Sequence, residues 1–205
     1  MSESADRDAP PPIAEAVGGA LGIAESVVPS AAFIATYTAT GQETQPAVIA
    51  AVALGACFGV ARVVRRQTAQ FALAGLVGIG ISAYVVSRTG RAEDFFLPGL
   101  LANAGYALAY AVSIAVRWPL LGVVIALASN RGMEWRQDPA RVRAYSRASW
   151  VWVGLFSLRL AVQLPLYLSG AVVALGVTRV AMGLPLFAVG IWLSWLILRA
   201  QERAS

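Results

Sequence analysis

The sequence contains no histidine and no lysine, and its one cysteine, Cys57, lies in an apolar run. Without histidine there is no imidazole base and no histidine-ligated metal, and a lone cysteine forms neither an intramolecular disulfide nor a paired zinc site. The phosphate-binding, serine-hydrolase and zinc-protease motifs are missing as well. We therefore predict a protein that is not an enzyme and that uses no metal and no cofactor.

Charged residues are also scarce. They make up 13% of the 205 residues, whereas 58% are hydrophobic, and soluble domains have about 25% charged residues. All 16 basic residues are arginines, which is typical of GC-rich coding, and the net charge is +5. Arginines beside membrane spans usually fix topology and contact anionic lipid, so this charge does not indicate a nucleic-acid partner. The composition predicts an all-α, polytopic membrane helix bundle.

Long apolar runs divide the chain into about six predicted transmembrane helices and two short apolar half-helices. The half-helices, 120–129 and 170–183, are too short or too interrupted to cross, since a crossing needs about 20 apolar residues, and we expect them to be re-entrant or interfacial. Residues 13–200 are predicted to form a single transmembrane domain between a disordered, proline-rich tail (1–12) and a C-terminal tail (201–205). The predicted spans are 13–38, 46–64, 68–86, 95–116, 149–168 and 184–198.

Basic residues gather after the second predicted span, in the loop 131–147 and in the C-terminal tail. Cytoplasmic loops of membrane proteins carry excess arginine, so these three places and both termini are predicted to lie on the cytoplasmic side of the cytoplasmic (inner) membrane of a bacterium. Asp138 and Pro139 predict the start of a helix that continues into the fifth span. Four arginines of the loop are predicted to contact anionic lipid headgroups, with a cytoplasmic protein partner as the alternative: Arg136, Arg141, Arg143 and Arg147.

Polar residues inside the predicted spans form the candidate site. Glu25 in the first span and Arg159 in the fifth are ionisable groups that need a partner or water when lipid surrounds them. The fourth span carries a polar stripe at helical spacing, and Gln163 lies one turn after Arg159. The candidate substrate-binding or ion-binding residues are Glu25, Asn103, Tyr106, Tyr110, Arg159 and Gln163.

These residues fit two functions of different classes. They could line the central site of a small-solute or proton-coupled transporter or channel-like protein, with Glu25 carrying the proton. The alternative to this leading hypothesis is that they form a salt bridge and hydrogen bonds within a non-transporting membrane scaffold of the cell envelope or division machinery. The sequence leaves both functions open, together with the identity of a small polar solute and the formation of a homo-oligomer.

Four segments resemble an actinobacterial membrane-protein family catalogued as domain of unknown function 3159. The resemblance covers about residues 14–200 and implies a multi-span inner-membrane protein of an actinobacterium, without implying an activity or site residues. The chain also loosely resembles the intracellular septation protein family in size and span pattern, which is a fold-level analogy. The four segments are GGALGIAESVVPSAAF (18–33), RTGRAEDFFLPGLLANAGYALAYAVSIAVRWPLLG (88–122), MEWRQDP (133–139) and LFSLRLAVQLPLYL (155–168).

Overall fold

The computed structural model describes residues 19–64, 69–129 and 132–202, with side chains for 27–61, 75–129 and 132–201, and these ranges contain no β-strand. Within them, six α-helices have 19 to 30 residues. They are α2 (Gly19–Ala39), α3 (Thr44–Val64), α4 (Ala69–Thr89), α5 (Leu97–Ala115), α7 (Pro139–Leu168) and α9 (Leu184–Glu202). Two short helices, α6 (Leu120–Ala128) and α8 (Val172–Ala181), complete the set. The predicted all-α class, with long helices and two short ones, is confirmed.

Four stretches in the described residues are long and apolar enough to cross a membrane: Thr44–Ala61, Ala92–Ala115, Pro139–Leu168 and Val172–Gln201. Several such helices in one chain fit an integral membrane protein. The predicted total of six crossings, the type of membrane and the side on which the termini lie stay predictions. The chain also divides into two compact units, Met1–Ser87 and Arg88–Ser205, and each is described by itself. The single domain predicted for 13–200 therefore also stays a prediction.

The first unit contains the antiparallel hairpin of α2 and α3, and then α4. The hairpin turns at Gly41 and Gln42, whose φ angles of 71° and 74° lie in the left-handed region. Phe33 of α2 and two alanines of α3, Ala47 and Ala51, are fully buried. Small side chains on α3 let the neighbouring helices approach closely, which is how membrane helices associate without a hydrophobic driving force.

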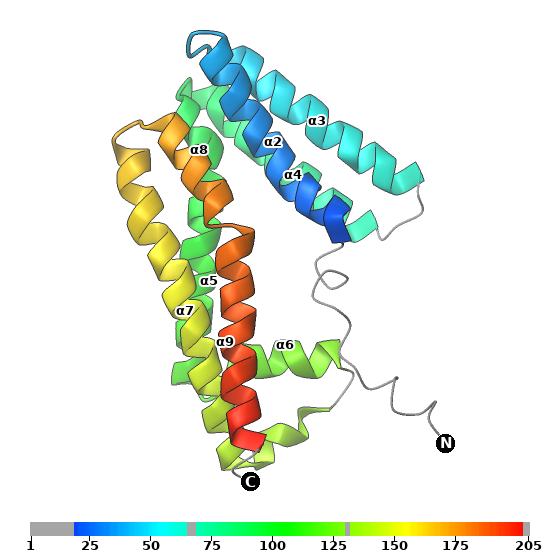
Figure 1. The fold of residues 1–205 in the computed structure, drawn as a ribbon, viewed down its shortest axis with the longest axis vertical. Coiled ribbons are helices and arrows are strands. Elements are labelled where there is room, and N and C mark those ends of the chain that lie inside the picture. The colour runs from blue at the N-terminus through cyan, green and yellow to red at the C-terminus, as the bar shows by residue number, and fades with distance from the viewer. Residues whose placement is uncertain (1–18, 65–68, 130–131, 203–205) are drawn as a thin grey trace. The chain divides into compact units, whose positions relative to one another are not determined.

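In the second unit, α5, α7 and α9 run alongside one another, and the short helix α6 crosses them near one end (Figure 1). The helices α5 and α7 are antiparallel, and three pairs of contacting side chains fix their register. These pairs are Tyr110 with Trp152, Tyr106 with Phe156, and Asp94 with Tyr167. The polar stripe of α5 therefore faces α7 along most of its length, as its helical spacing predicts.

The helix α8 leads directly into α9. The chain turns after α7 at Gly170, whose φ angle is 68°, and α8 then runs back along α7. It ends where the amide of Gly183 donates to the carbonyl of Val180, and α9 begins where the amide of Phe187 donates to the carbonyl of Gly183. The two helices form one candidate span of 30 residues with a break at Gly183. The predicted half-helix at 170–183 is thus the first part of a broken candidate span.

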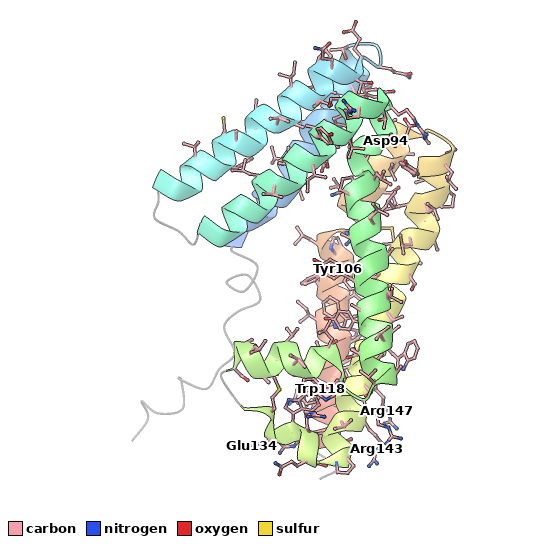
Figure 2. All side chains as sticks on the ribbon, turned by 180° about the vertical axis from the view of Figure 1, so that it is seen from behind. Asp94, Tyr106, Trp118, Glu134, Arg143 and Arg147 are labelled. Carbon is pink, nitrogen blue, oxygen red and sulfur yellow. The ribbon has the colours of Figure 1, made fainter. Side chains whose placement is uncertain are left out.

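The other end of the second unit holds α6, the 3-10 helix η2 (Met133–Gln137) and the start of α7. The Asp138 carboxylate accepts a hydrogen bond of 2.8 Å from the amide of Ala140, and Pro139 follows it, so the predicted helix start is confirmed. With nine residues, α6 is too short to cross a membrane, as expected. Figure 2 shows Trp118, Arg143 and Arg147 at this end, far from Asp94.

Candidate functional site

Two arginines lie at the level of the break between α8 and α9. Arg159 is about 14 Å of helix from the end of α7 at Leu168, and Arg179 is about 10 Å of helix from the start of α8 at Val172. Since the apolar core of a bilayer is about 30 Å thick, distances of about 10 to 14 Å from a helix end place both arginines well inside their candidate spans. Their guanidinium groups are close enough to repel each other electrostatically. A methyl group on Gly183 would lie 3.8 Å from Nη2 of Arg159, which places that guanidinium at the break.

The two arginines lack the partners that buried cations normally have. The ion pairs in the part of the chain that the structure describes are Arg91 with Glu93 and Arg141 with Asp138, so neither Arg159 nor Arg179 is paired with an acid there. Nε of Arg159 is buried and has no hydrogen-bond partner among the described residues. A charge inside a membrane span without a partner is costly, so this pair requires a compensating group.

Gln163 follows Arg159 by one turn on the same face of α7. Its side chain is 2% exposed, and its Nε2 donor is buried without a partner among the described residues. Asn103 of α5 is also buried, and the helix register places it opposite Arg159, one turn beyond the contact between Tyr106 and Phe156. We refer to Arg159, Gln163 and Arg179 as the arginine layer.

The position of Arg179 depends on Gly99 of α5. A methyl group on Gly99 would overlap the guanidinium of Arg179, so an alanine here would require that guanidinium to move. Nη1 of Arg179 donates to the carbonyl oxygen of Phe96 at 3.5 Å, and the guanidinium carbon lies 5.7 Å from the centre of the Phe96 ring. A cation over an aromatic ring is attracted by the ring electrons, which orients Arg179 without neutralising its charge.

A second polar group lies at the start of α5, in the 3-10 helix η1 (Ala92–Phe96). The Asp94 side chain is 3% exposed, and it accepts a hydrogen bond of 2.5 Å from the hydroxyl of Tyr167 at the end of α7. Beside it, Nε of Arg91 donates to Glu93 at 2.7 Å, and this hydrogen bond raises the pKa of Arg91 above its usual value. These acids are therefore engaged at this end of the bundle and are not partners of the arginine layer.

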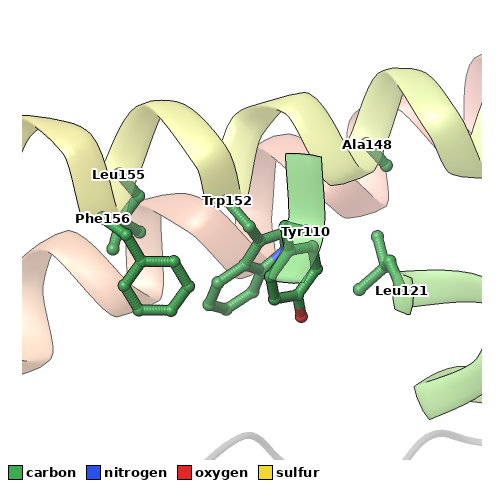
Figure 3. Close-up of a cluster of buried hydrophobic side chains, with 6 residues drawn as sticks. All are labelled: Tyr110, Leu121, Ala148, Trp152, Leu155 and Phe156. Atoms are coloured by element: carbon green, nitrogen blue, oxygen red, sulfur yellow. The ribbon is translucent and has the colours of Figure 1, made fainter. Parts of the chain in front are cut away.

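On the opposite side of the arginine layer, the same helices carry large aromatic side chains. Tyr110, Trp152 and Phe156 pack together with ring centres about 6 Å apart, Tyr110 stacked on Trp152 and Phe156 tilted against both (Figure 3). Phe187 of α9 meets Trp152 edge to face at 4.9 Å. Nε1 of Trp152 donates to the hydroxyl of Ser194 at 3.1 Å, and that hydroxyl donates to the carbonyl of Gly190. We refer to Tyr110, Trp152, Phe156 and Phe187 as the aromatic layer.

The structure brings only some of the predicted site residues together. Arg159, Gln163 and Asn103 share one level, whereas Tyr110 belongs to the aromatic layer and Tyr106, 55% exposed, packs against Phe156 at its edge. The side chain of Glu25 lies outside the described residues, so its predicted contact with Arg159 stays a prediction.

The four arginines predicted to contact lipid lie in η2 and in the first turns of α7. The guanidinium of Arg136 covers the Trp118 ring at 4.0 Å, and Arg141 pairs with Asp138 at 3.4 Å. Arg143 and Arg147 are exposed at the same end of the bundle (Figure 2). Their binding to anionic lipid or to a protein partner stays a prediction.

Comparison with known families gives one match. The model of the family described as "Protein of unknown function (DUF3159)" matches residues 17–205, which is most of the chain. The chain belongs to this family. No curated protein and no solved structure matches it. The family assignment confirms the resemblance seen in the sequence, and it brings no activity, so the function of this DUF3159 protein has to be argued from its site.

Sequence reasoning missed two residues of this DUF3159 protein. Arg179 lies in the predicted half-helix 170–183 and is not among the predicted site residues, although an arginine inside an apolar segment is the same signal that singled out Arg159. Asp94 is not among the predicted site residues, and nothing in its sequence context shows that Tyr167 would cover it.

Proposed function

We propose that the protein transports a small solute and that the solute binds at the arginine layer. The supporting observation is the pair of guanidinium groups, Arg159 and Arg179, beside the helix break at Gly183. Ionisable residues at this depth usually mark the pathway of a substrate or an ion. Many transporters bind their substrate where a membrane helix is interrupted near mid-depth, because the interruption frees backbone groups and side chains for the substrate.

The unpartnered donors favour transport over a purely structural role. In a scaffold the polar groups between helices would be expected to satisfy one another, as Trp152 and Ser194 do in the aromatic layer. In the arginine layer, Nε of Arg159 and Nε2 of Gln163 lack partners among the described residues. Donors that are left free in the protein are available to a solute.

The test is uptake into liposomes that contain the purified protein. The panel is radiolabelled succinate, phosphate, glucose, glycine and putrescine, which covers dianionic, neutral and cationic solutes. We expect at least one solute to enter faster than it enters protein-free liposomes. We expect Arg159→Gln to lower that uptake by about tenfold or more, since one charged contact is worth about 1.5–3 kcal/mol.

The control is Gly105→Ala on α5, where a methyl group meets no atom within 4 Å. This variant should keep the uptake of the unmodified protein. If no member of the panel enters faster than into protein-free liposomes, or if Arg159→Gln transports as well as Gly105→Ala, the proposal is wrong and the scaffold function is favoured.

A further inference from the structure

We infer that the solute is a small oxyanion that carries two negative charges, such as a dicarboxylate, and that Arg159 and Arg179 bind it together. This inference rests on the proposed function for the location of the site, and it adds the chemical class of the solute. Three properties of the arginine layer lead to it: its charge, its excess of hydrogen-bond donors, and the way in which α5 and α9 surround it.

The charge of the layer specifies the charge of the solute. Arg159 and Arg179 place two positive charges near each other inside candidate spans. Among the described residues of this unit, three acids have other partners: Glu93 pairs with Arg91, Asp138 with Arg141, and Asp94 accepts from Tyr167. Each charge costs several kcal/mol to bury without compensation. One bound monoanion would leave a net positive charge in the layer, whereas a dianion neutralises both guanidinium groups.

The hydrogen-bonding groups of the layer specify an acceptor. A guanidinium group has five N–H donors and no acceptor, and the unpartnered atom of Gln163 is its Nε2 donor. A carboxylate or phosphate accepts two parallel hydrogen bonds from one guanidinium, which is the strongest form of this contact. A sugar hydroxyl or an amine would bring further donors to a layer that already has free ones.

The surrounding backbone also favours an anion. The helix α9 begins at Leu184, directly after the break beside Arg159, and the first turn of a helix carries unpaired N–H groups and a partial positive charge. In broken membrane helices such a start commonly faces an anionic group of the substrate. The contacts of Arg179 with Gly99 and Phe96 hold its guanidinium in place before a solute arrives, which lowers the entropy cost of binding.

The experiment measures the melting temperature of the purified protein in detergent. Sodium succinate, sodium phosphate and sodium sulfate are titrated at constant ionic strength against sodium chloride, with succinamide and putrescine as neutral and cationic comparisons. A ligand that binds only the folded protein raises its melting temperature. We expect a saturable rise of several degrees with at least one dianion and none with succinamide or putrescine. A shift with succinate alone assigns the dianion to the dicarboxylates, and a shift with phosphate alone assigns it to the phosphates.

Two variants test whether the arginine layer causes the shift. Arg179→Gln removes one charge and should abolish the rise in melting temperature. Gly99→Ala keeps the charge but displaces the guanidinium, and we expect the dianion to bind about tenfold more weakly or worse. Gly105→Ala, on the same helix, should bind like the unmodified protein. If Arg179→Gln fails to fold, the difference between Gly99→Ala and Gly105→Ala gives the answer.

The inference is wrong if no dianion raises the melting temperature above the sodium chloride control, or if the rise is the same in all variants that fold. Its failure can be told apart from failure of the transport proposal. Uptake of glucose, glycine or putrescine that depends on Arg159 would support transport and exclude the dianion. Saturable binding of succinate or phosphate without uptake into liposomes would support the dianion site and exclude transport.

Discussion

The aromatic layer and the arginine layer are built from the same helices, a few turns apart, yet they treat polar groups in opposite ways. In the aromatic layer, the indole N–H of Trp152 has an acceptor in Ser194, and the rings around it fill the space between α5, α7 and α9. In the arginine layer, buried donors of Arg159 and Gln163 have no acceptor among the described residues. The aromatic layer pairs its polar groups internally, whereas the arginine layer leaves donors free to bind a solute.

This difference indicates where stability and where binding are located. A packed and satisfied layer contributes to the free energy of unfolding, because membrane helices associate through close packing and interhelical hydrogen bonds. A layer with two repelling cations opposes folding, and such destabilising groups are typical of sites that bind a substrate or an ion. Substitutions in the aromatic layer should therefore change stability, and those in the arginine layer should chiefly change ligand binding.

The largest expected effect is that of Trp152→Ala. Removing this buried ring deletes its contacts with Tyr110, Phe156 and Phe187, and should lower the free energy of unfolding by about 3 kcal/mol. Equilibrium unfolding in mixed micelles measures the change. Trp150→Ala is the matched control, because Trp150 lies on the outer face of α7 and is 57% exposed. Equal losses in the two variants would contradict the assignment of the aromatic layer as the stabilising core.

A smaller effect is expected for Ser194→Ala, which would leave a donor of the aromatic layer without an acceptor, as two donors of the arginine layer already are. Nε1 of Trp152 would lose its acceptor while the surrounding packing stays intact, and the free energy of unfolding should fall by about 1 kcal/mol. The exposed Ser157 of α7 provides the control in Ser157→Ala. A Ser194→Ala variant as stable as this control would mean that an unpaired donor costs little in this bundle.

The smallest effect is expected for Tyr167→Phe at the end of the bundle. This change removes the hydrogen bond to Asp94 without altering the ring, and interhelical hydrogen bonds of membrane proteins contribute about 0.6 kcal/mol on average. Tyr106→Phe serves as the control, since Tyr106 is largely exposed. Dianion binding should be unchanged in Tyr167→Phe, and a loss of binding would show that Asp94 and Tyr167 belong to the solute site.

Much of the fold is predictable because the patterns that encode it are local. A membrane-length apolar run needs no tertiary partner to be a helix, since lipid offers the backbone no other hydrogen bonds. Asp138 before Pro139 specifies a helix start through its own side chain, and the structure has that cap. The polar spacing along α5 likewise predicts the face that meets α7.

The site was less predictable because its members come from segments whose pairing the sequence does not encode. Arg159 and Gln163 were found from their spacing on one helix. Arg179 joins them only because the chain turns at Gly170 and α8 runs back along α7, which brings two like charges together against the expectation that they avoid each other.

The sequence by itself determined that this is a helical membrane protein of the DUF3159 family, since composition and apolar run length depend on no long-range contact. Only the tertiary structure decided which polar residues share a level. It separated Tyr110 from Arg159, joined Asp94 to Tyr167, and placed Arg179 against Gly99 at the helix break. The physical reason is that helix formation follows from local hydrogen bonds and lipid contact, whereas the register between helices follows from side-chain packing across the bundle.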